Sequence, residues 1–187
     1  MSHFSHLNSL ATPTNLCIGV GLSASSFLYW GNLGLVRCGP FAIMNTKTRD
    51  ALGIRPAQAL QIWEDAYDRG AVHFFPSGVI GFLAFLTAGI LRGSGDHPRS
   101  ALFFIASAAN FAVGFFTFTA IMPLNNHLKS ILRSAEKRSG KKNAPELESE
   151  KEAEETLGSI DKWKTLNAVR MGFALFGWTA ATVAILL

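Results

Sequence analysis

AVHFFPSGVIGFLAFLTAGIL, residues 71–91, is an uninterrupted apolar stretch in which His73 is the single ionisable side chain. Its length matches the ~20 residues that an α-helix needs to cross the ~30 Å hydrocarbon core of a bilayer. The apolar residues are continuous rather than alternating, which excludes a strand of a membrane β-barrel. The stretch therefore predicts a transmembrane helix.

Three further stretches of this kind are present at residues 16–36, 101–124 and 168–187, and Arg170 is the one charged side chain within them. Of the 187 residues, 49% are apolar, which is high for a soluble chain. No Lys or Arg precedes the first stretch, so we expect a retained helix rather than a signal peptide. The fold class predicted for residues 1–187 is all-α, a single integral membrane four-helix bundle.

The basic residues predict how the helices are oriented. Besides Arg37, which directly follows the first stretch, thirteen Lys and Arg lie in the loops after the first and third stretches, and two lie in the loop after the second. Basic loops favour the cytoplasm, so we expect both termini on the non-cytoplasmic side. The net charge of +4 is explained by these loops, and the partner we expect is the lipid bilayer, with no nucleic acid. The endoplasmic reticulum or another internal membrane is the expected location, and the oligomeric state stays open, a homo-oligomer included.

Two loop segments have a distinct character. After Pro56, which suits a helix start, apolar side chains recur with helical spacing, which predicts a short amphipathic cytoplasmic helix. Residues 134–158 are crowded with charges and carry few apolar side chains. We expect a solvated cytoplasmic linker there, helical at most from residue 145 to 157, that contributes little to the fold.

Polar residues gather at the cytoplasmic ends of the predicted helices. They are Arg37, His73, Asn125, Asn126, His127, Trp163, Asn167 and Arg170. Polar side chains are costly in hydrocarbon and usually face the bundle interior. Trp163, Asn167 and Arg170 are spaced i, i+4, i+7 and so share one helix face. The alternative is that the arginines near helix ends extend to lipid phosphates and that Trp163 is an interfacial anchor.

Metal or redox chemistry has little support in the sequence. Cys17 and Cys38 lie at opposite ends of the first stretch, roughly 30 Å apart along a helix, too far for a disulfide. Apart from His3 and His6 in the N-terminal tail, no two histidines have the i, i+3 or i, i+4 spacing of metal ligands, and no carboxylate accompanies His73. We expect no metal and no cofactor, and a copper or iron site involving His73 and His127 is a minor alternative.

Four motifs carry a family resemblance. They are Gly39–Pro40 after the first stretch, WEDAYDRGAVHFFP (residues 63–76), MPLNNHL (residues 122–128) and WKTLNAVRMG (residues 163–172). In this order and topology the chain resembles the four-helix membrane anthrone oxygenases of fungal aromatic polyketide pathways. The resemblance covers the whole chain except the charged linker.

The resemblance implies a monooxygenase of polyketide biosynthesis, part of secondary metabolism, that oxidises an anthrone to an anthraquinone. Molecular oxygen would be the co-substrate, and the small aromatic polyketide would supply the electrons after losing a proton. His73 would then be the base, and Arg170 with Asn125 or Asn167 would stabilise the enolate oxygen. The resemblance further implies that substrate contacts Trp63, Tyr67, Phe74, Phe75, Asn126, Trp163 and Arg37.

Two other classes of function remain open from the residues alone. A non-catalytic four-helix scaffold or adaptor would use the polar residues only to fix helix packing. A small transporter would need polar side chains through the full depth of the membrane, whereas only Asn110 and a few Ser and Thr lie near its centre.

Overall fold

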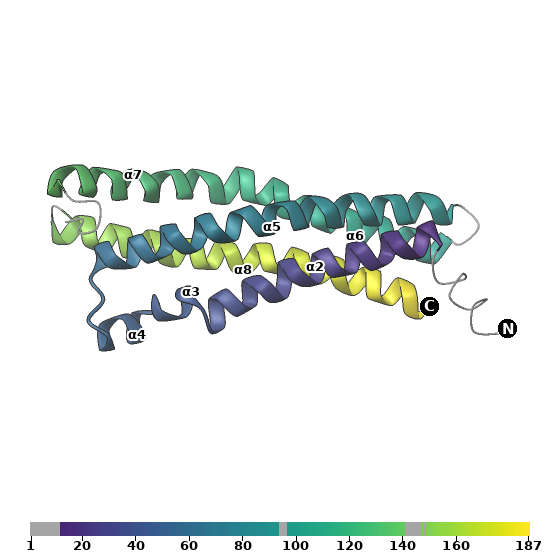
Figure 1. Cartoon of the computed structure of the whole chain (residues 1–187), viewed down its shortest axis with the longest axis horizontal. Coiled ribbons are helices and arrows are strands. Elements are labelled where there is room, and N and C mark those ends of the chain that lie inside the picture. The colour runs from purple at the N-terminus through teal and green to yellow at the C-terminus, as the bar shows by residue number, and fades with distance from the viewer. Residues whose placement is uncertain (1–11, 94–96, 141–146, 148) are drawn as a thin grey trace. The chain divides into compact units, whose positions relative to one another are not determined.

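The computed structural model describes residues 12–93, 97–140, 147 and 149–187, and its regular elements in these ranges are all helical (Figure 1). The elements are α2 (Pro13–Arg37), α3 (Pro40–Ile43), α4 (Thr46–Ala51), α5 (Pro56–Arg92), α6 (His97–Phe116), the π-helix η2 (Thr117–Ile121), α7 (Met122–Ser139) and α8 (Glu150–Leu186). Four helical segments are long and apolar enough to cross a membrane. The predicted all-α membrane four-helix bundle is confirmed.

The amphipathic segment that begins at Pro56 is helical, but it is not a separate element. α5 starts at Pro56 and runs without a break through the second apolar stretch to Arg92, a length of 37 residues. The side chain of Gln58 accepts a hydrogen bond from the Arg55 backbone N–H at 2.9 Å, just before the first turn. Gly93, with φ of +66°, follows the last turn in the left-handed conformation that favours glycine. The amphipathic segment is therefore continuous with the second apolar stretch in one helix.

Residues 134–158 were expected to form a solvated linker. This expectation is corrected, because helices occupy most of the described part of the segment. α7 continues to Ser139, and α8 already begins at Glu150. Ser149 Oγ accepts a hydrogen bond from the Glu152 N–H at 3.2 Å, which is one half of a helix-capping box. Thr156 is fully buried, and Arg138 on α7 donates to both carboxylate oxygens of Glu152 at 2.8 Å. These contacts make the segment part of the folded protein.

The chain divides into two compact units. Unit 1 comprises Met1–Gly31, Phe74–Phe115 and Met171–Leu187, and unit 2 comprises Asn32–His73 and Phe116–Arg170. Each unit has its own buried core.

Unit 1 buries small and polar side chains and exposes large apolar ones. Its core combines Phe85 and Phe103 with alanines of α6 and α8, while Leu83, Phe111 and Phe176 are about half exposed. Large apolar side chains on the outside are typical of a surface that contacts lipid, and small ones inside allow helices to pack closely. Unit 1 therefore has the surface expected of a membrane-embedded segment.

At the centre of unit 1, Asn110 of α6 holds α2 and α6 together. Its Oδ1 accepts a hydrogen bond from Ser25 Oγ at 2.9 Å, and its Nδ2 donates to the Ala106 carbonyl at 2.9 Å. A Cβ added at Gly81 or Gly177 would lie 2.7 Å or 2.9 Å from the Asn110 side chain. The two glycines thus leave the room that this buried amide needs, and its hydrogen bonds give it a structural role.

Unit 2 has a core of large side chains. Trp63, Leu60 and Leu128 are fully buried there, and Trp163 is 2% exposed. The core is built from α3, α5, α7 and the first half of α8. Buried within and beside it are the polar side chains that form the candidate site.

Candidate functional site

The candidate site begins with Arg170, near the middle of α8. Its guanidinium donates a hydrogen bond to Asn32 Oδ1 at 3.0 Å and another to Asn167 Oδ1. Asn32 is 3% exposed and Asn167 is fully buried. One face of the helix carries Trp163, Asn167 and Arg170, as their spacing predicts. Because they share this face, Asn167 and Arg170 are in contact.

The partners of Arg170 are neutral amide oxygens. Within the described part of the chain no Asp or Glu pairs with this guanidinium. Arg170 is partly buried, and a cation withdrawn from water is usually paired with an anion, since burying it without one is costly. Arg170 therefore presents a positive charge, held in a fixed orientation, that an incoming negatively charged oxygen would complement.

A second part of the site is built around the Trp163 indole. Its Nε1–H donates to Asn125 Oδ1 at 2.8 Å. The Phe41 ring lies 4.7 Å from the Trp163 ring and the Trp63 ring lies 6.1 Å away, edge to face. Tyr67 stacks on Trp63 with ring centroids 5.4 Å apart and planes only 7° from parallel. The result is a rigid aromatic cluster with a polar amide at its edge.

A change in helix winding precedes Asn125. The π-helix η2, Thr117–Ile121, comes directly before α7, and Pro123 occupies the first turn of α7. Proline has no N–H and its ring clashes with the preceding turn, so the regular α-helical ladder cannot continue through this point. π-Helical turns often occur at functional sites. The chain beyond this turn brings Asn125 to a position where it is 1% exposed.

Two donors in this cluster have no acceptor. Trp63 Nε1 and Asn125 Nδ2 are buried, and no group of the described residues accepts a hydrogen bond from either. A buried donor without a partner costs about 1–3 kcal/mol, so native proteins rarely contain one without a reason. The cluster therefore offers two unused N–H groups, on two residues that contact the Trp163 indole.

The aromatic cluster leads to the protein surface through Tyr67 and Lys129. Tyr67 is half-buried, and the Lys129 ammonium lies 5.2 Å from its ring centroid. Lys129 also forms an ion pair with the exposed carboxylate of Asp68. Such a cation over an aromatic face stabilises the ring position by about 0.5–2 kcal/mol. Tyr67 and Lys129 thus cover the outer side of Trp63.

Several residues predicted for the site lie outside this cluster. Arg37 and Asn126 are exposed, and Phe74 and Phe75 belong to unit 1, where Phe74 packs against Phe27 at 5.6 Å. His73 is exposed on α5, whereas the asparagine oxygens that hold Arg170 are buried.

The possible metal ligands are not grouped. His127 Nε2 lies 3.5 Å from a carboxylate oxygen of Glu155, and both side chains are exposed. Among the described residues no group of three or more His, Cys, Asp or Glu side chains could hold a metal ion. The structure thus assembles no ligand set around His127 within these ranges.

Sequence reasoning missed the roles of two residues. Asn32 was visible as a lone amide near the end of the first apolar stretch, but its partner Arg170 lies 138 positions away. Lys129 was counted only as a basic loop residue, because nothing in the sequence indicates that it covers Tyr67. A polar residue inside an apolar stretch is the signal that would have identified Asn32.

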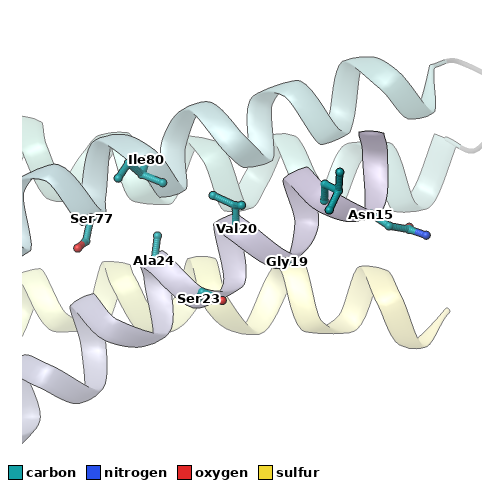
Figure 2. Close-up of a pocket in the computed structure, with 8 residues that line it drawn as sticks. Asn15, Gly19, Val20, Ser23, Ala24, Ser77 and Ile80 are labelled. Carbon is teal, nitrogen blue, oxygen red and sulfur yellow. The ribbon is translucent and has the colours of Figure 1, made fainter. Parts of the chain in front are cut away.

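Unit 1 contains an open groove of about 500 Å³ (Figure 2). It is lined by small and apolar side chains of α2 between Asn15 and Ala24, together with Ser77 and Ile80 of α5. None of these side chains titrates, so the groove offers no group for acid–base chemistry.

Comparison with known proteins adds one finding. Residues 63–180 match the family model described as anthrone oxygenase. No curated protein and no solved structure shows a significant match. The matched region begins at Trp63 and includes Tyr67, Asn125, Trp163 and Arg170, so the polar and aromatic cluster of unit 2 lies largely within it. Since the match covers more than half of the chain, this protein belongs to the anthrone oxygenase family.

Proposed function

We propose that this protein is a membrane-embedded oxygenase that converts an anthrone-type aromatic polyketide into an anthraquinone with molecular oxygen. Its membership of the anthrone oxygenase family supports the reaction class. The observation that carries the proposal is the Arg170 guanidinium, which Asn32 and Asn167 hold while no carboxylate in the described residues pairs with it. A fixed donor of this kind stabilises negative charge that develops on an oxygen during a reaction.

The reaction starts with loss of a proton from the methylene group between the two aromatic rings of the anthrone. The resulting enolate passes one electron to dioxygen, and recombination of the two radicals forms a carbon–oxygen bond and gives a peroxide. Removal of the second methylene proton with cleavage of the O–O bond gives the quinone carbonyl and one molecule of water. The substrate loses four electrons and dioxygen gains four, so the reaction balances.

Arg170 would bind the enolate oxygen, because its charge and planar donor geometry match an oxygen that becomes negative. Asn167 and Asn32 are positioning residues, since their amide oxygens fix the guanidinium. Trp63, Trp163 and Tyr67 would provide flat apolar walls for an aromatic substrate. Excluding water from such a site strengthens the electrostatic interaction with the enolate.

His73 is the base that we propose for the first proton transfer. Imidazole exchanges protons near neutral pH, and His73 is the histidine within the second apolar stretch. Its exposure would let it pass the proton on to solvent or to the membrane interface. This role is independent of the role proposed for Arg170 and is tested separately.

The chemistry requires no resident metal or organic cofactor, because the deprotonated substrate itself reduces dioxygen. We therefore propose that the enzyme uses none. A copper or iron ion bound by His73 and His127 is the competing hypothesis, which metal removal and addition distinguish.

The bilayer is the route that we propose for the substrate, since a tricyclic anthrone partitions into hydrocarbon, where dioxygen is also concentrated. We place the protein in the endoplasmic reticulum or another internal membrane, with both termini on the non-cytoplasmic side. The excess of Lys and Arg in two loops supports this orientation. A reporter fused after Leu187 should read as non-cytoplasmic, and a cytoplasmic signal would refute the orientation.

The experiment that tests the function is incubation of purified, metal-stripped protein with a panel of anthrones under oxygen while quinone absorbance is followed. Quinone formation above the uncatalysed rate is the expected result. Activity that returns only after copper or iron is added would support the metal hypothesis. No activity with any anthrone would contradict the proposal and leave the scaffold and transporter hypotheses.

A further inference from the structure

Two buried side chains in unit 2 have donors that the fold itself leaves unused. Within the part of the chain that the structure describes, Trp63 Nε1–H and Asn125 Nδ2–H bond to no acceptor, although Trp63 is fully buried and Asn125 is 1% exposed. The neighbouring Trp163 has the same indole N–H, and this donor is satisfied by Asn125 Oδ1 at 2.8 Å. The same cluster thus contains one indole that is satisfied and one that is not.

The two side chains that carry the unused donors both contact Trp163. Trp63 contacts Trp163 edge to face, with ring centroids 6.1 Å apart, and Asn125 accepts the Trp163 hydrogen bond. That bond fixes the orientation of the Asn125 amide, so its oxygen is used and its NH₂ group is available. Both available donors are neutral, in contrast to the charged guanidinium of Arg170.

We propose that Trp63 Nε1–H and Asn125 Nδ2–H bind a second oxygen of the aromatic substrate, a phenolic or carbonyl oxygen other than the one that becomes the enolate. This inference rests on the proposed function and adds substrate selection to it. Neutral donors suit a neutral acceptor, whereas Arg170 suits the oxygen that becomes negative. The preferred substrate class is therefore an oxygenated anthrone, and unsubstituted anthrone would leave both donors unpaired.

Tyr67 covers the Trp63 ring, which carries one of the two donors. Its ring is half-buried, stacks on Trp63 at 5.4 Å and has the Lys129 ammonium 5.2 Å from its centroid. A flat aromatic ligand can replace the stacked phenol ring by the same kind of contact. Tyr67 would then act as a cover that the substrate displaces.

The test compares two ligands, anthrone and a monohydroxyanthrone, bound without oxygen so that no turnover occurs. The whole protein in lipid nanodiscs should bind the hydroxylated ligand about tenfold more tightly, the effect of one or two net hydrogen bonds. Trp63→Phe removes the donor and keeps an aromatic ring, so the preference should fall below about threefold by the same reasoning. Phe41→Leu is the matched control, because it alters the same aromatic cluster without removing a donor, and it should retain the preference.

Thermal unfolding separates this role from a purely structural one. Trp63→Phe should lower the melting temperature less than Trp163→Phe, because only Trp163 loses a hydrogen bond made within the protein. If Trp63→Phe does not fold, the test uses the wild-type protein with nitrogen-labelled tryptophan instead of the variant. The Trp63 indole N–H resonance should then shift downfield with monohydroxyanthrone and not with anthrone.

The subsite is overturned if the wild-type protein binds neither ligand, if it binds both equally, or if the preference persists in Trp63→Phe. Turnover assayed separately under oxygen distinguishes this failure from failure of the proposed function. Selective, Trp63-dependent binding without quinone formation would support the subsite and contradict the oxygenase. Quinone formation without selective binding would support the oxygenase and contradict the subsite.

Discussion

The Arg170 guanidinium donates a hydrogen bond to Asn32 Oδ1 at 3.0 Å, which joins α8 to α2 across 138 positions of sequence within unit 2. The same guanidinium donates to Asn167 one turn earlier on α8. Arg170 is thus fixed from two helices by oxygens that carry no charge.

Asn32→Leu should weaken both the fold and the reaction. Hydrogen bonds to charged groups contribute about 1.5–3 kcal/mol, so the free energy of unfolding should fall by about that amount. Quinone formation should fall by about tenfold or more, because Arg170 loses one of the two groups that orient it. Asn15→Leu is the control, since Asn15 is an exposed asparagine on the same helix. Equal activity of Asn32→Leu and wild type would show that the contact does not position the guanidinium for catalysis.

Arg170→Lys keeps the positive charge and removes the planar guanidinium that reaches two amide oxygens. Loss of an oxyanion donor typically lowers kcat by about 10²–10³, and we expect a loss of that order. Steady-state kinetics on purified protein would measure it. Arg69→Lys is the matched control, because Arg69 pairs with Asp65 on an exposed surface at 2.9 Å and such pairs contribute about 0–1 kcal/mol. A nearly silent Arg170→Lys variant would mean that the arginine only extends to the membrane interface.

His73→Ala should lower quinone formation by about 10²–10⁴, the usual contribution of a general base. The variant should remain folded, since His73 is exposed. Raising the pH should partly restore its activity, because hydroxide or an already ionised substrate replaces the missing base. No such rescue is expected for Arg170→Lys. A fully active His73→Ala protein would contradict the assignment of His73 as the base. His127→Ala would then be the next variant to measure.

Gly177→Ala should destabilise unit 1. Its Cβ would lie 2.9 Å from Asn110 Nδ2 and 3.1 Å from the Ala106 carbonyl oxygen, and overpacking of this kind costs about 1–3 kcal/mol. Gly172→Ala on the same helix is the control, because its Cβ would meet no atom within 4 Å. Alanine favours a helix over glycine by about 1 kcal/mol, so Gly172→Ala should be neutral or stabilising. Thermal unfolding in detergent would compare the two, and equal melting temperatures would contradict the tight packing around Asn110.

The sequence predicted the helices well because the relevant signals are local. Apolar length identifies a span, and the i, i+4, i+7 spacing places Trp163, Asn167 and Arg170 on one face. The capping pair Ser149 and Glu152 was also readable as a helix start. A helix within residues 145–157 was expected, and α8 begins there at Glu150; the burial of Thr156 was not expected, because composition alone predicts a solvated linker.

The site could be predicted only in part, because its contacts join distant segments. Asn125 and Trp163 meet through packing between α7 and α8, and their hydrogen bond spans 38 positions. The unused Trp63 donor is a property of the packed core and has no counterpart in sequence spacing. The location of Phe74 and Phe75 in unit 1 likewise depends on how α5 packs. These two residues follow His73 directly in sequence, yet they do not belong to the aromatic cluster of unit 2.

The most direct test of the central claim is the fate of dioxygen. Metal-stripped protein would be incubated with a hydroxylated anthrone under isotopically labelled oxygen gas, and the quinone and water would be analysed by mass spectrometry. The account predicts one labelled oxygen atom in the new quinone carbonyl, the other in water, and one dioxygen consumed for each quinone formed. Absence of conversion above the uncatalysed rate, or a quinone oxygen derived from water, would contradict it.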